Sequence, residues 1–391
     1  MIESRVDFAS LSLFPATRAQ VEGSWRRTWP QWGGTLSLTE YLTREAEMES
    51  MDHAKDGRLI TWVLAPRDDP TTLDFMCSCE AFKRSGLVAY PSSSTSEPNS
   101  VHEVTCYAIA SVFTPPSKRG RGYASHMMRL LYWVIASRAN LPKFPQAWGA
   151  PPEQVTEASE GLFSCLYSDV GEYFYRSAGP GGKEGGWETR GAVSTIWDVD
   201  TEERNDDDDI GWTWLTQEQL NGLWDRDAGR INKELANMLT SDTSYEVQRP
   251  AAFVTYLPTN GVCGFHIPRS TYASDVSMVG GFWGIQSLND PDTYASWSVD
   301  FRPPPPTLII TRLCASEETF PGLIAKITQA ARRSGIGKVE VWKLGEGLKD
   351  IAERTGGRTV IRNEHLPQIV WYGPGATGNI EWVYNEKFGW C

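Results

Sequence analysis

The sequence lacks several features that would assign it to a specialised class of protein. No apolar run approaches the roughly 18 residues that a membrane-spanning helix requires. The opening stretch, MIESRVDFAS, does not have the basic and then apolar pattern of a secretory signal. The five histidines are scattered, without the spacing of a metal site. We therefore expect a globular cytosolic protein that binds no metal and has no membrane partner.

Cysteine and positive charge are also limited. The seven cysteines are odd in number and include no C-x-x-C pair, which argues against a disulfide framework and a zinc knuckle. Cys77 and Cys79 are two residues apart and are expected on one face of a strand, as small core side chains. The 49 acidic residues outnumber the 37 basic ones, and the formal charge is −12. This balance argues against nucleic-acid binding and is compatible with a cationic small-molecule ligand.

The length of 391 residues favours two domains, because single hydrophobic cores stop growing near about 250–300 residues. The sharpest change in composition is the acidic run TEERNDDDD, and a block of like charge seldom packs in a core. We expect a first domain at 1–200, an acidic linker at 201–210 and a second domain at 211–391. A similar order of strands and helices in both halves suggests a duplicated architecture whose second copy has diverged.

Hydrophobic periodicity predicts the individual elements. Ser37 and Glu40 have the spacing of a capping box at the start of a helix. The polar tract 90–100 is expected to be a loop. Strands are expected at 59–66, 73–82, 101–113, 161–170, 191–199, 307–313, 338–344, 359–373 and 380–390, and helices at 36–48, 124–135, 172–179, 212–239, 320–335 and 348–356.

The most informative segment joins the apolar strand 101–113 to the helix 124–135. Between them lies the run Arg119-Gly120-Arg121-Gly122-Tyr123-Ala124. Glycines let a backbone approach a ligand closely, and the first turn of a helix offers free N–H groups and a positive dipole end. With two arginines beside it, this turn is suited to a pyrophosphate. The spacing fits neither a nucleotide P-loop nor a Rossmann turn, and the alternative is a basic turn that only caps a helix.

The pattern R-x-x-G-x-A formed by Arg119, Gly122 and Ala124 resembles the coenzyme A motif of the GNAT N-acetyltransferase superfamily. Downstream, LYSDVGEYFYRSAG resembles the second half of that fold, where a tyrosine lies four residues before a glycine, here Tyr175 and Gly179. The strings SVFTPP, RGRGYASHMM and LYSDVGEYFY are most similar to fungal lysine N6-acetyltransferases.

This resemblance implies an α/β GNAT fold, with a mixed, mostly antiparallel central sheet and splayed strands. A diverged GNAT-like α/β domain in the second half would close the acceptor site. The implied co-substrate is acetyl-CoA, and the implied partner is a small-molecule amine, with the ε-amine of free L-lysine as the specific acceptor. Acetylation of another amine and a non-catalytic CoA-binding role are the alternatives. The oligomeric state does not follow from the sequence.

The resemblance also implies roles for individual residues. The end of the strand would offer N–H groups to the pantetheine arm and the thioester carbonyl, and the turn would hold the pyrophosphate. The expected cofactor-binding residues are Val112, Phe113, Thr114, Arg119, Gly120, Arg121, Gly122, Tyr123 and Ala124.

Acetyl transfer also needs a base for the amine and an acid for the leaving thiolate. We expect Glu103 to be the base, with His102 as a weaker rival and a solvent-facing or Lys-paired carboxylate as the alternative. We expect Tyr175 to be the acid, unless it only packs in the core. Tyr173 lies about 200° away around a helix, so the two tyrosines cannot face the same atom.

Several tryptophans have no assigned role in this scheme. Trp25, Trp29 and Trp32 are candidates for an acceptor pocket or for an ordered loop. Trp390 and Cys391 would reach the first domain only if the end of the chain folded back, an arrangement found in myristoyl-CoA transferases.

Overall fold

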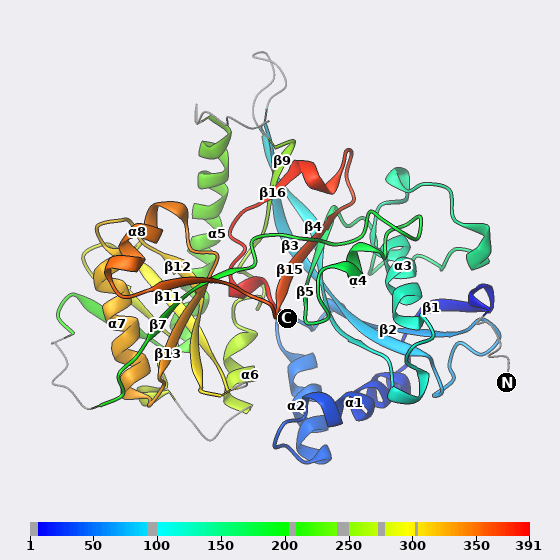
Figure 1. Cartoon of the computed structure of the whole chain (residues 1–391), viewed down its shortest axis with the longest axis horizontal. Helices are drawn as coiled ribbons and strands as arrows, with labels where there is room; N and C mark the ends of the chain where they lie inside the picture. The colour runs from blue at the N-terminus through cyan, green and yellow to red at the C-terminus, as the bar shows by residue number, and fades with distance from the viewer. Residues whose placement is uncertain (1–6, 92–99, 203–208, 241–249, 273–277, 302–303) are drawn as a thin grey trace.

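The computed structural model describes most of the chain and contains two β-sheets with helices packed against them (Figure 1). The expected loop at 90–100 and the acidic block at 201–210 lie largely outside the described residues. The described residues are 7–91, 100–202, 209–240, 250–272, 278–301 and 304–391.

The first sheet has nine strands and is mixed, as expected from the resemblance. Its main order is β1-β2-β3-β4-β5-β15-β6, while β9 pairs with β3 and β16 pairs with β9. The pairs from β1 to β4 are antiparallel, and β4 and β5 are parallel. The strands are β1 (Leu11–Pro15), β2 (Leu59–Pro66), β3 (Cys77–Tyr90), β4 (Ser100–Phe113), β5 (Phe163–Ser168), β6 (Glu188–Thr189), β9 (Ala252–Tyr256), β15 (Leu366–Trp371) and β16 (Ile380–Trp382).

The second sheet has seven strands in the order β14-β7-β13-β12-β11-β10-β8. Among the described strand pairs of this sheet, β12 and β13 form the only parallel one, and helix α7 connects these two strands. The strands are β7 (Val193–Asp198), β8 (Trp212–Leu215), β10 (Gly284–Ser287), β11 (Tyr294–Asp300), β12 (Thr307–Cys314), β13 (Lys338–Trp342) and β14 (Arg358–Ile361).

The two sheets do not divide the chain at 201–210. β7 precedes this block but belongs to the second sheet, where it pairs with β13 and β14. Conversely, β9, β15 and β16 follow it but belong to the first sheet. Periodicity within one segment identifies a strand but carries no information about its distant pairing partner, so this exchange was not predictable from the local patterns.

The helices largely follow the expected pattern. The capping box at Ser37 is confirmed, since its hydroxyl accepts a hydrogen bond from the Glu40 N–H. The helix expected over 212–239 is wrong at its start, because Trp212–Leu215 pairs with β10 as strand β8. The helices are α1 (Arg18–Trp32), α2 (Leu38–Ser50), α3 (Tyr123–Ile135), α4 (Tyr173–Arg176), α5 (Gln217–Thr240), α6 (His266–Tyr272), α7 (Phe320–Arg333) and α8 (Glu346–Arg354).

The hydrophobic cores connect the two halves. One core packs the apolar face of α3, including Met127 and Leu131, against Trp62 and Tyr107 of the first sheet. A second core joins α5 to β5, β9 and β15, and a third surrounds α7 on the second sheet. Figure 1 shows the end of the chain at the centre of the molecule, between the two sheets.

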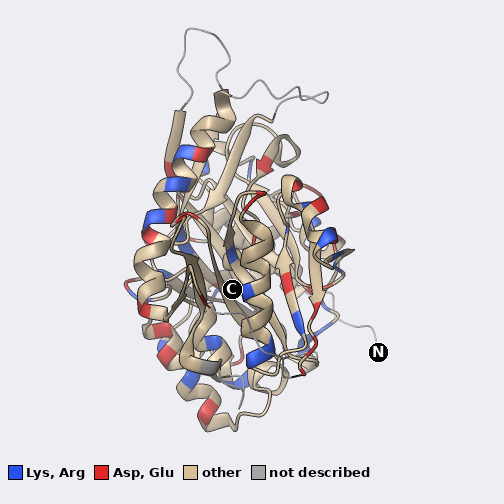
Figure 2. Ribbon diagram, turned by 90° about the vertical axis from the view of Figure 1, so that its left-hand side faces the viewer, with Lys and Arg blue, Asp and Glu red and all other residues tan. Residues whose placement is uncertain are grey.

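Charged residues are dispersed on the side of the molecule shown in Figure 2, where the helices carry residues of both signs rather than a single basic stripe. Among the residues that the structure describes, no helix is both long enough and apolar enough to cross a bilayer. All seven cysteines are free, and six of them are buried.

Candidate active site

The site is built around an irregularity in β4. The register of β3 against β4 shifts, so that Glu80 faces Ala110 while Ser78 faces Phe113. Ser111 lies within this bulge and has a φ of 53°, in the left-handed region that non-glycine residues seldom adopt. A β-bulge inserts an extra residue and bends the strand that carries it. The end of β4 is therefore turned relative to its neighbours.

The bend separates β4 from β5. Their parallel pairing ends at Ile109 and Leu166, although β5 continues to Ser168. Beyond Ile109, the described strands leave the β5 side of β4 unpaired. Unpaired backbone groups at a strand edge can hydrogen-bond an extended ligand. The splayed strands expected from the resemblance are present at this point of the chain.

The predicted phosphate turn follows directly. Gly120 and Gly122 have φ values of 75° and 80°, a conformation that glycine adopts without steric cost. Gly122 precedes the first residue of α3, and no side chain caps this helix start. The N–H groups of the first turn of α3 are thus available to an anion.

The two arginines of this turn differ in their contacts. The Arg119 Nε donates a 2.9 Å hydrogen bond to the Thr114 carbonyl, and its guanidinium lies 5.6 Å from the centre of the Phe113 ring. Arg121 is exposed and makes no hydrogen bond or ion pair with the described residues. One arginine is held against the end of β4, while the other is free to contact a ligand.

These features line a cavity of about 900 Å³. Helices α1, α2, α4 and α6, the end of β4 and the last residues of the chain contribute to it. All nine predicted cofactor-binding residues line the cavity, together with Tyr175. A cavity of this size is in the range that binds small molecules and cofactors.

Acidic and aromatic side chains form much of the remaining lining. The carboxylates come from Glu45, Glu49, Glu80 and Asp169. Of the four tryptophans considered from the sequence, three contribute to the lining and Trp29 does not. The aromatic residues include Trp25, Trp32, Tyr41, Phe82, Phe265 and Trp390.

Glu80 lies on β3, opposite the bulge. The Ser111 hydroxyl donates a 2.7 Å hydrogen bond to its carboxylate. Burial raises the pKa of Glu80 to about 7, and the negative charge of Glu45 adds to this effect, whereas Arg269 opposes it. Glu80 can therefore gain or lose a proton near neutral pH. Glu80 is not among the site residues predicted from the sequence, although a carboxylate inside the apolar run of the expected strand 73–82 was a usable signal.

Tyr175 lies on α4, and its side chain is 9% exposed. Its ring packs edge-on against Phe174, with 4.8 Å between the ring centres. Burial raises the pKa of Tyr175 above its ordinary value, so the hydroxyl keeps its proton at neutral pH. Tyr173 is 78% exposed and does not line the cavity. The structure thus separates the two tyrosines as their spacing predicted.

Glu103 lies away from the cavity. It is exposed near the start of β4, opposite Leu87, and His102 is exposed beside it. Ile109, the first residue of β4 in the cavity lining, follows six residues later, a distance of about 20 Å along an extended strand. The structure does not bring Glu103 to the other predicted site residues. Glu103 lies near the first residue of β4, whereas the strand separates from β5 near its last residue, Phe113.

The carboxyl-terminal segment (residues 384–391) folds back toward the first sheet. The Arg84 Nη1 donates a 2.7 Å hydrogen bond to the Gly389 carbonyl. Lys387 is buried and forms a 3.0 Å ion pair with Asp300. These contacts hold the segment so that Trp390 and Cys391 line the cavity. The fold-back considered from the sequence is therefore present.

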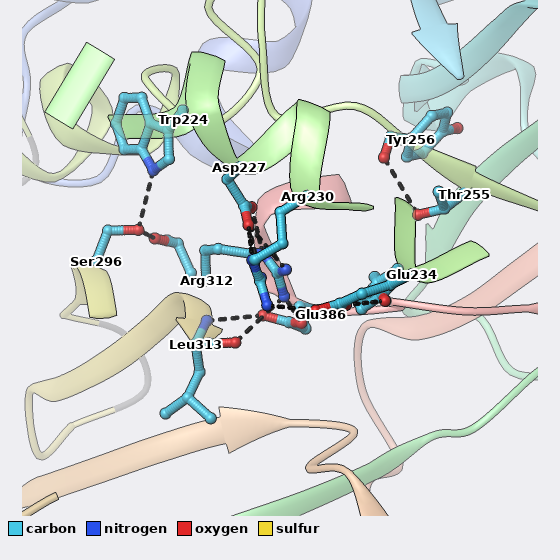
Figure 3. A network of polar contacts seen from close by, with 12 residues as sticks. Trp224, Asp227, Arg230, Glu234, Thr255, Tyr256, Ser296, Arg312, Leu313 and Glu386 are labelled. Carbon is cyan, nitrogen blue, oxygen red and sulfur yellow. Dashed lines mark hydrogen bonds and ion pairs between the residues drawn. The ribbon is translucent and has the colours of Figure 1, made fainter. Parts of the chain in front are cut away.

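A buried ionic network anchors the same segment (Figure 3). Arg312 of β12 is 1% exposed and pairs with Asp227 of α5 at 2.7 Å and with Glu386. Glu386 also accepts a 2.9 Å hydrogen bond from the Leu313 N–H, and Asp227 pairs with Arg230 at 2.6 Å. The network thus joins the carboxyl-terminal segment to a helix and a strand of the second half.

Comparisons with known proteins agree with this architecture. Residues 197–391 match the family model described as the LYC1 GNAT-like C-terminal domain. A lysine acetyltransferase from Yarrowia lipolytica (strain CLIB 122 / E 150) is 28% identical over 145 residues, which are 37% of this chain and only 34% of that protein.

Solved structures share the fold at low sequence identity. A probable N-acyltransferase from Enterococcus faecalis V583 gives a TM-score of 0.53 at 11% identity, over 93% of this chain and 72% of the other. A GCN5-related N-acetyltransferase from Anabaena variabilis ATCC 29413 gives 0.52 at 12% identity, over 93% and 73%.

The mixed sheet, the separation of β4 from β5 and the glycine-rich turn at the start of α3 give this chain a GNAT-like fold, similar to that of these two structures. Its second half, residues 197–391, is similar to the LYC1 GNAT-like C-terminal domain.

Proposed function

We propose that this chain transfers the acetyl group of acetyl-CoA to the amine of a small molecule, and that its acceptor is the ε-amine of free L-lysine. The observation that carries this proposal is convergence on one cavity. The phosphate turn, the open edge of β4, Glu80 and Tyr175 all contribute to its lining. The name of the Yarrowia relative supports lysine as the acceptor.

The residues present fit the co-substrate. The first turn of α3 and the guanidinium groups of Arg119 and Arg121 are suited to the pyrophosphate of CoA. The unpaired side of β4 beyond Ile109 is suited to the amide-containing pantetheine arm. When bound, acetyl-CoA supplies an acetyl group that is activated as a thioester.

Glu80 and Tyr175 would carry the proton transfers. Glu80 takes a proton from the acceptor ammonium, and the freed nitrogen bonds to the acetyl carbonyl carbon as the carbon–sulfur bond breaks. N–H groups of β4 stabilise the charge on the carbonyl oxygen. The Tyr175 hydroxyl protonates the departing sulfur. The second nitrogen proton leaves as the amide forms and restores this hydroxyl through solvent, and Glu80 releases its proton to solvent.

We assign this reaction to the cytoplasm, where cysteine thiols stay reduced. The seven free cysteines of the chain support this assignment. The proposed partners are small molecules alone, with neither nucleic acid nor membrane involved.

The test is the release of free CoA from acetyl-CoA in the presence of L-lysine, D-lysine, a linear diamine and a polyamine, with the product identified by mass spectrometry. We expect L-lysine to give the highest kcat/KM and to be acetylated at the ε-nitrogen. A higher kcat/KM with another amine would reassign the acceptor. Binding of acetyl-CoA without acetylation of any amine would instead identify a non-catalytic CoA-binding protein.

A further inference from the structure

Arg269 is a cation in the cavity that the reaction scheme above does not use. It lies on α6, in the second half of the chain, and its side chain lines the cavity and is accessible. The ring centres of Phe265 and Trp390 lie 5.9 and 4.5 Å from the guanidinium carbon. These aromatic contacts hold the guanidinium in place and leave its N–H donors unused.

No hydrogen bond or ion pair joins Arg269 to any residue in the described part of the chain, in contrast to Arg44 and Lys118 of the same lining. Arg44 donates a 2.9 Å hydrogen bond from its Nε to Glu45. Lys118 forms a 2.7 Å ion pair with Asp74. Arg269 is thus a cavity-facing guanidinium whose donors are not satisfied by the described protein.

The histidines of the lining are poor alternatives for binding an anion. His365 already faces Asp169, with 3.1 Å between Nδ1 and Oδ1. Burial lowers the pKa of His53 to about 3, so this side chain is neutral at physiological pH.

The surroundings of Arg269 favour an incoming anion. Desolvation by the surrounding protein atoms lowers the pKa of Arg269, and the positive charge of Arg44 lowers it further, although the negative charges of Glu45 and Asp300 partly oppose this effect. A guanidinium in such a position is stabilised by a carboxylate that accepts two parallel hydrogen bonds. The carboxylates of the lining are already engaged elsewhere, as Glu80 is with Ser111 and Asp169 is with His365.

We infer that Arg269 binds a carboxylate of the acceptor, and that the acceptors are amino acids whose reactive amine is separated from that carboxylate by a flexible chain. This inference rests on the proposed acetyltransferase function. No ion pair joins Arg269 and Glu80, both of which are described, although Arg269 lowers the pKa of Glu80. The acceptor spans the space between them, with its amine at Glu80 and its methylene groups against aromatic walls such as Tyr41 and Phe82.

Three acceptors isolate the contribution of the carboxylate. L-Lysine has a carboxylate and two amines, 6-aminohexanoate has a carboxylate and only the distal amine, and 1,5-diaminopentane has two amines and no carboxylate. In the wild-type protein we expect L-lysine and 6-aminohexanoate, which carry a carboxylate, to have lower KM values than 1,5-diaminopentane.

Arg269→Gln should raise the KM for L-lysine and 6-aminohexanoate by about 10- to 100-fold, because a charge-assisted hydrogen bond is lost. The KM values for 1,5-diaminopentane and acetyl-CoA should stay within about twofold, since neither depends on this contact. Arg269→Lys keeps the charge and should give intermediate values. Arg226→Gln is the matched control, because Arg226 is exposed on α5 and, among the described residues, its side chain hydrogen-bonds only the Gly222 carbonyl of the same helix.

An equal rise in KM for all three acceptors, or no rise for any, would overturn the inference while leaving acetyl transfer intact. Calorimetric titration with L-lysine and 1,5-diaminopentane gives the same comparison without turnover. If no amine is acetylated but Arg269→Gln still weakens L-lysine binding selectively, the proposed function fails and the carboxylate site stands. If both Arg269 variants lose the binding of L-lysine and of 1,5-diaminopentane together, the result would count against the carboxylate site.

Discussion

The Ser111 hydroxyl donates a 2.7 Å hydrogen bond to the Glu80 carboxylate, and this bond links two functions of the site. Ser111 has the left-handed backbone conformation of the bulge that turns β4 away from β5. Glu80 is the residue of β3 that faces the start of this bulge. The distortion that opens the strand edge for a ligand therefore also orients the proposed proton acceptor beside that edge.

Replacing Glu80 with glutamine tests its role as the base. We expect kcat to fall by about 10²- to 10⁴-fold, because glutamine cannot accept the ammonium proton. In the wild-type protein, the rate should rise with pH and level off above the Glu80 pKa of about 7. The variant should lose this dependence. Steady-state rates across the neutral pH range measure both effects.

Glu103→Gln is the matched control, since it makes the same chemical change at an exposed position outside the cavity. Its kcat and its pH profile should equal those of the wild type. If Glu103→Gln loses activity while Glu80→Gln retains it, Glu103 and not Glu80 is the base.

The same pKa predicts an effect on stability. The pKa of Glu80 is raised from 4.5 to about 7 in the folded protein, so folding favours the protonated carboxyl. The stabilising contribution of this group is fully present below pH 4.5 and is lost as the pH rises through about 7. Glu80→Gln should therefore be more stable than the wild type at pH 8, by about 1–3 kcal/mol.

Urea unfolding at pH 5 and pH 8 measures this difference, which should shrink at the lower pH. Glu103→Gln should give no such pH-dependent gain. A Glu80→Gln protein that is less stable than the wild type at pH 8 would show that the carboxylate stabilises the fold.

Tyr175→Phe tests the proposed acid. The change removes a hydroxyl whose pKa is raised by burial and leaves the aromatic ring to pack as before. We expect kcat to fall by about 10- to 1,000-fold with little change in thermal stability. Tyr173→Phe makes the same change at an exposed side chain two residues away and should leave kcat unchanged. Equal rates for Tyr175→Phe and the wild type would leave only a packing role for Tyr175.

The phosphate turn is predictable from the sequence because all of its parts are local. A strand, two glycines, two arginines and a helix start follow one another within one short stretch of chain. Their conformations depend on φ preference and on the free N–H groups of a helix, both of which are properties of residue type and order. The same reasoning explains why α2 and α3 begin within two residues of their predicted starts.

The proton acceptor and the anion site depend on distant pairing, which local patterns do not contain. Glu80 meets Ser111 across 31 residues, and only the register of β3 against β4 brings them together. Arg269 reaches the cavity from the second half of the chain, beside Trp390. The predicted base, Glu103, lies near the start of β4, whereas the bulge opens the other end of that strand, and Glu80 belongs to the neighbouring strand β3.

Charge reversal at the phosphate turn tests cofactor binding. Arg119→Glu should weaken acetyl-CoA binding by about 2–4 kcal/mol, because it replaces a charge-assisted contact with repulsion. Binding measured by calorimetry should also become less sensitive to salt. Arg226→Glu reverses a charge on exposed α5 and should leave the affinity unchanged. Unaltered binding by Arg119→Glu would contradict the assignment of this turn to the pyrophosphate.

The buried network around Arg312 gives a last prediction, which connects stability to acceptor binding. Arg312→Met leaves Asp227 and Glu386 in the interior without their shared cation. Breaking a buried ion pair in this way costs about 3–5 kcal/mol, which denaturant unfolding would detect. Because Glu386 anchors the segment that carries Trp390 to the cavity, the KM for the acceptor should also rise more than that for acetyl-CoA.

Arg358→Met is the control for the Arg312 variant, since it breaks an ion pair with Asp198 in which both side chains are more than half exposed. An exposed pair contributes at most about 1 kcal/mol, so stability and both KM values should change little. Equal losses of stability in the two variants would show that the buried ion pairs of Arg312 stabilise the fold no more than an exposed pair does. A large loss of stability in Arg312→Met with both KM values unchanged would separate the network from the positioning of Trp390.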